Sequence, residues 1–172
     1  MTLLELFKDK STKSKEKIIT IGEWLLDGSL PIEELLVFAE NAKDSDKASC
    51  IESIEFATKQ NAKIADENVL NFVTKSLDEP APRIKWESAK VIGNIAHLFP
   101  TNLNKTIEHL LINAKHNGTV VRWATAYAIG EIIKLKTKYN IYLIPTIESI
   151  CGNEKNDGVK KKYLDALKKI QK

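Results

Sequence analysis

Residues 84–95 read IKWESAKVIGNI, and residues 121–132, 37 positions later, read VRWATAYAIGEI. In both stretches an aliphatic residue and a base precede tryptophan, and an Ile-Gly pair follows at the same distance. Self-similarity with a period of about 20 to 50 residues marks supersecondary units that stack, because one unit cannot bury its apolar face alone. The two stretches therefore predict a repeat fold.

The same register recovers more copies of this helix. Residues 47–57 align upstream, and residues 159–170 align downstream with Ala166 on Ala128. A shorter copy lies at residues 18–25. Four full copies at regular spacing indicate that the repeat spans nearly the whole chain.

Shorter helical patterns lie between the copies, each with apolar residues at steps of three and four. They cover residues 32–42, 68–77, 103–114 and 143–151. Glycine, proline and Asx residues stand where the helices should turn: Gly28, Pro31, Asp66, Pro80, Pro82, Pro100, Gly118 and Asn156. We therefore expect an all-α fold, with residues 1–172 forming one domain of about four to five antiparallel helix pairs.

The unit resembles the HEAT repeat: two helices, an acidic or amide residue in the turn, and Val-Arg or Ile-Lys opening the second helix. The resemblance implies a right-handed α-α superhelix, with the second helices lining its concave face. It also implies a ladder of turn acids and bases from repeat to repeat. The corresponding pairs here are Arg122 with Asn117, Lys85 with Glu79, Lys160 with Asp157, and Lys47 with Asp44.

The helix of residues 121–135 carries two neighbouring apolar stripes. We expect these stripes to form core, and small residues within them to let adjacent helices approach closely. The stripes consist of Val121, Ala124, Ala128, Ile132 and Leu135, and of Ala126, Ile129 and Ile133.

A polar and aromatic ridge remains on each second helix. The ridges are Trp123, Tyr127, Glu131 and Lys134; Trp86, Lys90, Asn94 and His97; and Lys161, Asp165, Lys169 and Lys172. Trp, Tyr and Arg dominate interface hot spots. The predicted partner-binding strip is Trp86, Lys90, Trp123 and Tyr127, flanked by Lys85 and Arg122. The alternative interpretation is that the indoles only cover grooves between repeats.

Charge is uneven along the chain. Residues 31–79 carry 5 bases and 11 acids, a net charge of −6, whereas residues 80–172 carry 16 bases and 7 acids, a net charge of +9. The basic half leaves nucleic acid open as a second partner class beside protein. The lysines of residues 160–172 have the alternative interpretation of a solvated cap on the last repeat.

No phosphate loop, nucleophile elbow or paired catalytic carboxylates occur in the sequence. The HEAT-like bacterial alkylpurine DNA glycosylases need a carboxylate beside their aromatic residues, but Lys90 and Tyr127 stand one turn beyond the tryptophans here. Helical spacing directs Glu87 away from the face of Trp86. A lyase-like accessory role, as in HEAT-like proteins of pigment attachment, shares only the general repeat resemblance. We expect a non-enzymatic scaffold or adaptor with neither metal nor cofactor.

Two cysteines, Cys50 and Cys151, lie a hundred residues apart and lack ligand-like spacing. They are interpreted as small buried thiols in a reducing compartment. No apolar run approaches the roughly 18 residues of a membrane span, and charges interrupt the N-terminal segment. These features predict a cytoplasmic protein with no membrane partner, and leave the oligomeric state open.

Overall fold

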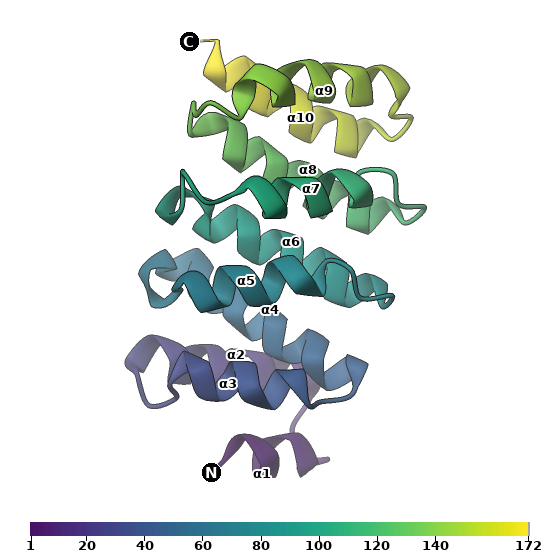
Figure 1. The fold of residues 1–172 in the computed structure, drawn as a ribbon. Helices are drawn as coiled ribbons and strands as arrows, with labels where there is room; N and C mark the ends of the chain where they lie inside the picture. The colour runs from purple at the N-terminus through teal and green to yellow at the C-terminus, as the bar shows by residue number, and fades with distance from the viewer. Residues whose placement is uncertain (172) are drawn as a thin grey trace.

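The chain alternates between two layers of helices in a computed structural model that describes residues 1–171 (Figure 1). The inner layer consists of α2 (Ser14–Asp27), α4 (Asp44–Gln60), α6 (Pro82–Ile95), α8 (Thr119–Lys134) and α10 (Asp157–Ile170). The outer layer consists of α3 (Ile32–Glu40), α5 (Glu67–Ser76), α7 (Asn104–Asn113) and α9 (Asn140–Asn153). The short α1 (Leu3–Lys8) precedes them, and 3-10 turns occupy Ala62–Ile64 and Ala96–Leu98. Lys172, which the sequence placed on the last ridge, lies outside the described residues.

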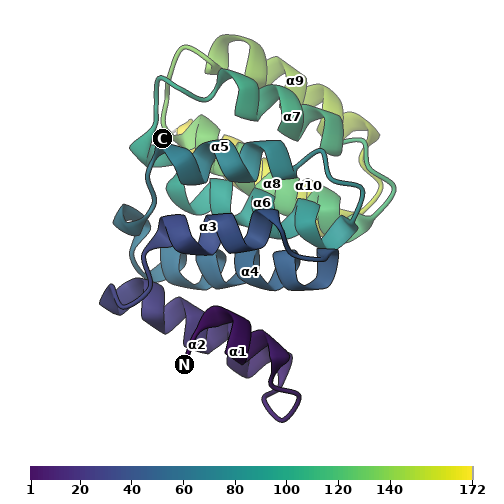
Figure 2. The same cartoon turned by 60° about the horizontal axis from the view of Figure 1, so that its bottom comes forward.

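Consecutive inner helices pack against one another along the whole stack, from α2 through α4, α6 and α8 to α10. Outer helices contact their outer neighbours much more sparsely, and each packs mainly on its own inner helix. In Figure 2 each outer helix lies above the inner helix that follows it, as with α3 above α4 and α7 above α8. The inner helices therefore form the more closely packed layer of the stack. We call the exposed side of the inner helices the inner face; it is the face that the sequence predicted to be concave.

The predicted all-α solenoid is confirmed. Both apolar stripes of α8 lie in the core, where Ala124, Ala128 and Ile129 have no exposed surface. Leu135 is only partly buried and packs against that core. Cys50 and Cys151 are buried free thiols, as predicted.

Local sequence signals explain where the helices begin and end. Gly28 ends α2 with a φ of 80°, a left-handed conformation that glycine adopts without strain. Asp66 and Asn156 accept hydrogen bonds from backbone N–H groups in the first turns of α5 and α10. Pro82 occupies the first turn of α6, where no N–H donor is needed. Throughout residues 1–171, every helix is too short or too polar to cross a bilayer.

Glycine in the inner helices makes room for rings from the next helix. A Cβ atom at Gly93 of α6 would collide with the Tyr127 ring of α8, and one at Gly22 of α2 would collide with the Phe56 ring of α4. The helices therefore approach closely because these positions lack a side chain.

We expect Gly93→Ala to destabilise the protein by about 1–3 kcal/mol, because the added methyl must displace a fixed aromatic ring. Gly152→Ala in α9 is the matched control, since a Cβ atom there meets nothing within 4 Å. Its stability should be unchanged or slightly raised by better helix propensity. Urea unfolding followed by circular dichroism measures both, and equal stability of the two variants would contradict the close approach.

Candidate functional site

The predicted strip residues Trp86 and Lys90 of α6 and Trp123 and Tyr127 of α8 are all half-buried on the inner face. The Trp123 and Tyr127 rings stack at a centroid distance of 6.4 Å and an interplanar angle of 15°. Lys162 of α10 places its Nζ atom 4.8 Å from the centre of the Trp123 ring and 5.7 Å from that of Tyr127. In such cation–π contacts the electron-rich ring faces attract the ammonium group. Trp123, Tyr127 and Lys162 thus form one aromatic and cationic cluster from α8 and α10.

A hydrogen-bond chain through three repeats fixes Tyr127. Its hydroxyl donates to Asn94 Oδ1 at 2.6 Å. Asn94 Nδ2 in turn donates to the Glu55 carbonyl oxygen and to Thr58 Oγ1, both on α4. Burial raises the pKa of Tyr127 to about 12, so the phenol remains a protonated donor at neutral pH. The ring therefore has a fixed orientation before any ligand arrives.

Glu87 lies beneath Trp86, contrary to the prediction that it points away from it. Trp86 Nε1 donates to Glu87 Oε1 at 2.9 Å, because the long indole reaches back over the adjacent residue. The Glu87 residue is only 4% exposed, and within residues 1–171 its Oε2 atom has no hydrogen-bond partner. Burial raises the pKa of Glu87, although Lys90 at 3.6 Å opposes this shift. The carboxylate holds the indole but is shielded from solvent.

Lys85 and Arg122 lie in the inter-repeat ladder rather than beside the tryptophan rings. Arg122 bonds to Glu154 at 3.1 Å and to the backbone carbonyls of His116 and Asn117. Lys85 donates to the Leu77 carbonyl and to Asn113 Oδ1. The structure therefore does not bring these two bases onto the strip.

The ladder acids come from the following repeat, which corrects the predicted pairs of Lys47 with Asp44 and of Lys85 with Glu79; Arg122 does contact the predicted Asn117, through its backbone carbonyl. Lys47 pairs with Glu79 at 3.0 Å, and Arg122 pairs with Glu154, in each case 32 residues later. Burial alone would raise the pKa of Glu154, but hydrogen bonds from Arg122 and the Asn156 backbone outweigh it and lower the pKa. The ladder thus ties neighbouring repeats together.

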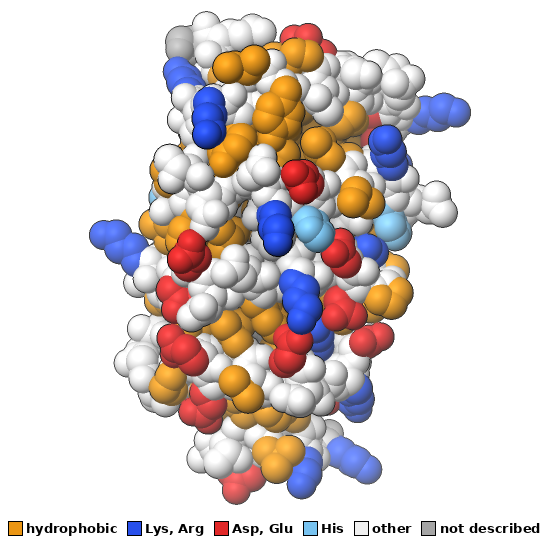
Figure 3. Space-filling view, viewed as in Figure 1, with side chains coloured by type: hydrophobic (Ala, Val, Ile, Leu, Met, Phe, Trp, Pro, Cys, Tyr) orange, Lys and Arg blue, Asp and Glu red, His pale blue; other side chains and the backbone are white. Residues whose placement is uncertain are grey.

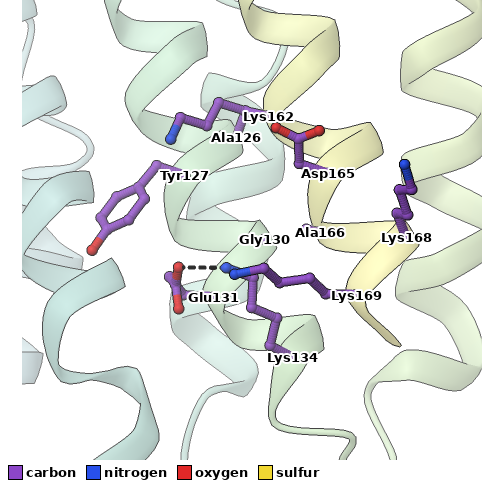
Figure 4. Close-up of a pocket in the computed structure, with 10 residues that line it drawn as sticks. All are labelled: Ala126, Tyr127, Gly130, Glu131, Lys134, Lys162, Asp165, Ala166, Lys168 and Lys169. Atoms are coloured by element: carbon purple, nitrogen blue, oxygen red, sulfur yellow. Dashed lines mark hydrogen bonds and ion pairs between the residues drawn. The ribbon is translucent and has the colours of Figure 1, made fainter. Parts of the chain in front are cut away.

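A cavity of about 390 Å³ opens on the inner face between α8 and α10 (Figure 4). Ala126, Gly130 and Ala166 form its small-residue floor. Tyr127 stands on one side, and charged side chains surround the opening: Glu131, Lys134, Lys162, Asp165, Lys168 and Lys169. The sequence left Lys162 as part of a solvated cap or as a contact to nucleic acid, because the pattern of one repeat does not reveal a contact between side chains of two helices.

The outer face carries a different, apolar groove between α7 and α9, where Figure 3 shows hydrophobic side chains gathered. Leu111, Ile112, Pro145 and Ile150 line it, and Ile112 is 67% exposed. This groove lacks the fixed aromatic rings of the inner face. It provides a natural control surface for experiments on the strip.

Side chains that commonly bind metals are scattered in the part of the chain that the structure describes, with no group of three or more His, Cys, Asp or Glu residues placed to hold an ion. His109 instead contacts Asp78 at 2.7 Å, and His116 Nδ1 accepts a hydrogen bond from the Gly118 N–H. These two histidines stabilise local structure.

Solved structures share this architecture over almost the entire chain. The complex of CpcE and CpcF of phycocyanin lyase from Nostoc sp. matches with a TM-score of 0.69 and 17% identity, covering 96% of this chain and 95% of that one. A designed armadillo repeat protein in complex with the peptide (KR)4 matches with a TM-score of 0.70 and 20% identity, over 97% and 80% of the two chains. The chain is a HEAT/armadillo-like solenoid. A second designed armadillo protein matches this solenoid with a TM-score of 0.67 and 18% identity, over 98% and 80%.

At the level of sequence, no family model and no curated protein matches this HEAT/armadillo-like chain. The structural likeness at these identities shows the fold alone.

The prediction that the protein is not an enzyme is wrong as an inference from this architecture. Phycocyanin lyase contains a chain of the same fold, matched over nearly the full length of this one. The solenoid is therefore compatible with catalysis, and the lack of familiar catalytic motifs does not exclude it. The finding assigns no reaction to this chain.

Truncating Arg122 tests the ladder. Its side chain is 19% exposed and that of Glu154 only 5%, so Arg122→Ala should cost about 1–3 kcal/mol by leaving a buried carboxylate without its partner. Lys161→Ala is the control, because the Lys161–Asp165 pair is 73% and 56% exposed and should contribute nothing measurable. Urea midpoints at neutral pH compare them. Equal losses would show that the ladder contributes no special stability.

A second prediction concerns the pH dependence of folding. Because the pKa of Glu87 is raised in the folded state, the native protein binds its proton more tightly than the unfolded chain does. This contribution to stability is present at low pH and is lost as pH rises from the ordinary glutamate value through the folded-state value. Glu87→Gln should flatten that dependence while its amide oxygen still accepts from Trp86. Unfolding free energies between pH 4 and 7 measure it, with Glu131→Gln as the control; an unchanged slope contradicts the assignment.

Proposed function

We propose that this solenoid binds a segment of a partner protein along its inner face, through Trp86, Lys90, Trp123 and Tyr127. The observation that carries the proposal is the stacked pair of Trp123 and Tyr127, half-buried and contacted by Lys162 of α10, with Trp86 half-buried on the preceding inner helix. Aromatic side chains with few rotatable bonds supply large contact area at low entropic cost. Lys85 and Arg122 are left out of the binding strip because the ladder engages them.

Preorganisation supports this role. Tyr127 is fixed through Asn94, and Trp86 is fixed through Glu87. A surface whose rotamers are already selected loses less conformational entropy when a ligand binds. The covering of grooves and the binding of a partner are thus compatible roles, since each ring packs on one side and is exposed on the other.

The comparisons support a partner-binding solenoid in coarse terms. One similar structure is a complex of two protein subunits, and another holds a peptide. Those partners belong to those proteins. For this chain the partner is proposed from the surface itself: a peptide segment with aromatic or apolar anchors. The two buried free thiols support the cytoplasmic location that we propose for it.

A peptide-display selection against the immobilised protein tests the proposal. The dissociation constants of selected peptides should rise at least tenfold, about 1.4 kcal/mol, in Trp123→Ala and in Lys90→Glu, because both changes alter the strip. Ile112→Ser on the outer groove is the matched control and should leave the affinity unchanged. Isothermal titration measures the affinities, and circular dichroism verifies that each variant is folded.

Two results would contradict this function. Selected peptides could bind both strip variants as tightly as the wild type, or lose affinity only in Ile112→Ser. Labelled single-stranded RNA and DNA are titrated in parallel by fluorescence anisotropy. Micromolar binding that falls steeply with salt would favour a nucleic-acid partner instead.

A further inference from the structure

The seams between neighbouring outer helices are closed in different ways. At the seam of α3 and α5, Lys75 pairs with Glu40 at 3.4 Å. At the seam of α5 and α7, the Oγ1 atoms of Thr74 and Thr106 share a buried hydrogen bond of 2.8 Å. Within residues 1–171, no side-chain hydrogen bond or ion pair joins α7 to α9, whose polar side chains bond within their own helices instead. This last seam therefore lacks a polar cross-link.

An apolar groove of about 910 Å³ lies at the seam of α7 and α9. These two helices also contact each other more sparsely than α3 and α5 or α5 and α7 do. Leu111 and Ile112 line the groove from α7, and Pro145 and Ile150 line it from α9. Exposed apolar surface is unfavourable in water, and a groove that gathers it is typical of a docking site.

One charge stands at each end of the groove. Glu108 precedes Ile112 by four residues and Lys115 follows it by three, so each lies about one turn away. Burial raises the pKa of Tyr142 and the charge of Glu108 adds to the rise, which places Glu108 near the beginning of α9. Lys115 also lines a neighbouring hollow with Asn153, at the end of α9. Neither Glu108 nor Lys115 forms an ion pair within residues 1–171.

The shape of the groove fits a third helix. Side chains of one helix pack as ridges into the grooves of others. A helix presents no row of unpaired backbone groups, so an extended strand would find no edge here. The groove is open rather than enclosed, so a small molecule would keep much of its surface in water. Glu108 and Lys115 lie about 10 Å apart along the axis of α7, which is the rise of seven helical residues. A partner helix aligned with α7 therefore meets both charges with residues seven positions apart.

We propose that the groove between α7 and α9 binds an amphipathic helix of a partner protein. Its apolar residues at i, i+3, i+4 and i+7 would cover Ile112 and the other apolar lining residues. A base and an acid seven positions apart on one flank would pair with Glu108 and Lys115. The groove belongs to the outer layer, whereas the strip lies on the inner face. This inference therefore goes beyond the proposed function and does not depend on it.

The test titrates the full chain with a matched pair of synthetic helices. Each peptide spans about four turns, is held helical by a hydrocarbon staple on its outward side, and carries leucine at i, i+3, i+4 and i+7. The two peptides differ only in the order of one Lys and one Glu, placed seven positions apart on the same flank. One order should bind about threefold more tightly than the other, because only that order sets opposite charges beside Glu108 and Lys115. Turning the weaker peptide end for end does not rescue it, since its flank then faces α9, which lines the groove with uncharged residues.

Variants of the groove separate the charge contribution from the apolar one. Glu108→Lys combined with Lys115→Glu exchanges the two charges and should invert the ranking of the peptides. Glu40→Lys combined with Lys75→Glu is the matched control, because it exchanges an exposed pair on the same outer face and should leave the ranking unchanged. Ile112→Ser should weaken both peptides about tenfold while the fold, verified by circular dichroism, is retained at this mostly exposed position.

Fluorescence anisotropy of the labelled peptides measures the dissociation constants, and Trp123→Ala on the strip should bind both peptides as the wild type does. The proposal is overturned if neither peptide binds saturably, if the charge exchange leaves the ranking unchanged, or if Ile112→Ser binds as tightly as the wild type.

Two other occupants of the groove are tested in parallel. Sedimentation equilibrium detects a second copy of this chain, and dodecanoate represents an apolar small molecule. A wild-type dimer that Ile112→Ser abolishes, or dodecanoate that binds more tightly than either peptide and displaces it, would assign the groove to that occupant and overturn the proposal.

Discussion

Close packing between consecutive inner helices is the contact on which the other features depend. Small residues of these helices, such as Ala89, Ala126, Ala128 and Gly130, are buried. They let backbones approach until a ring from one helix lies on a glycine of the next. The outer helices pack mainly on this inner layer and only sparsely on each other. The alignment of the polar ridges on one face follows from this stacking of the inner helices.

Much of the architecture could be predicted because the same apolar pattern and turn residues recur in several repeats. The inner helices, their buried stripes and the Asp66 and Asn156 caps depend on residues close in sequence. The helix α1 was missed, because Leu3 and Leu6 are too few to form a periodic pattern and are buried only by tertiary contact. The ladder acids were misassigned for a related reason. Sequence proximity favours the nearest polar turn residue, whereas stacking brings in Glu79 and Glu154 from the following repeat.

In the candidate site, too, the arrangement of residues within one helix could be predicted from the sequence, whereas contacts between helices could not. Helical spacing placed Trp123 and Tyr127 on one face, and the rings do stack. Spacing also directed Glu87 away from Trp86, yet the length of the indole carries its N–H group back to that carboxylate. Contacts between helices, such as Lys162 over Trp123, depend on the rotation of one repeat against the next. The period of the sequence pattern does not give that rotation, so these contacts could be identified only from the structure.

The ladder also gives the solenoid a direction. In each pair the cation belongs to the earlier repeat and the oxygen ligand to the later one, as for Lys47 with Glu79, Lys85 with Asn113 and Arg122 with Glu154. A break in the chain between α8 and α9 would leave the Arg122 guanidinium without its carboxylate on one fragment and the Glu154 carboxylate without its guanidinium on the other. The two cut surfaces would carry opposite charges at this place and would both expose apolar side chains. Such a molecule is suited to reassembly from halves, and two like halves would repel each other at that surface.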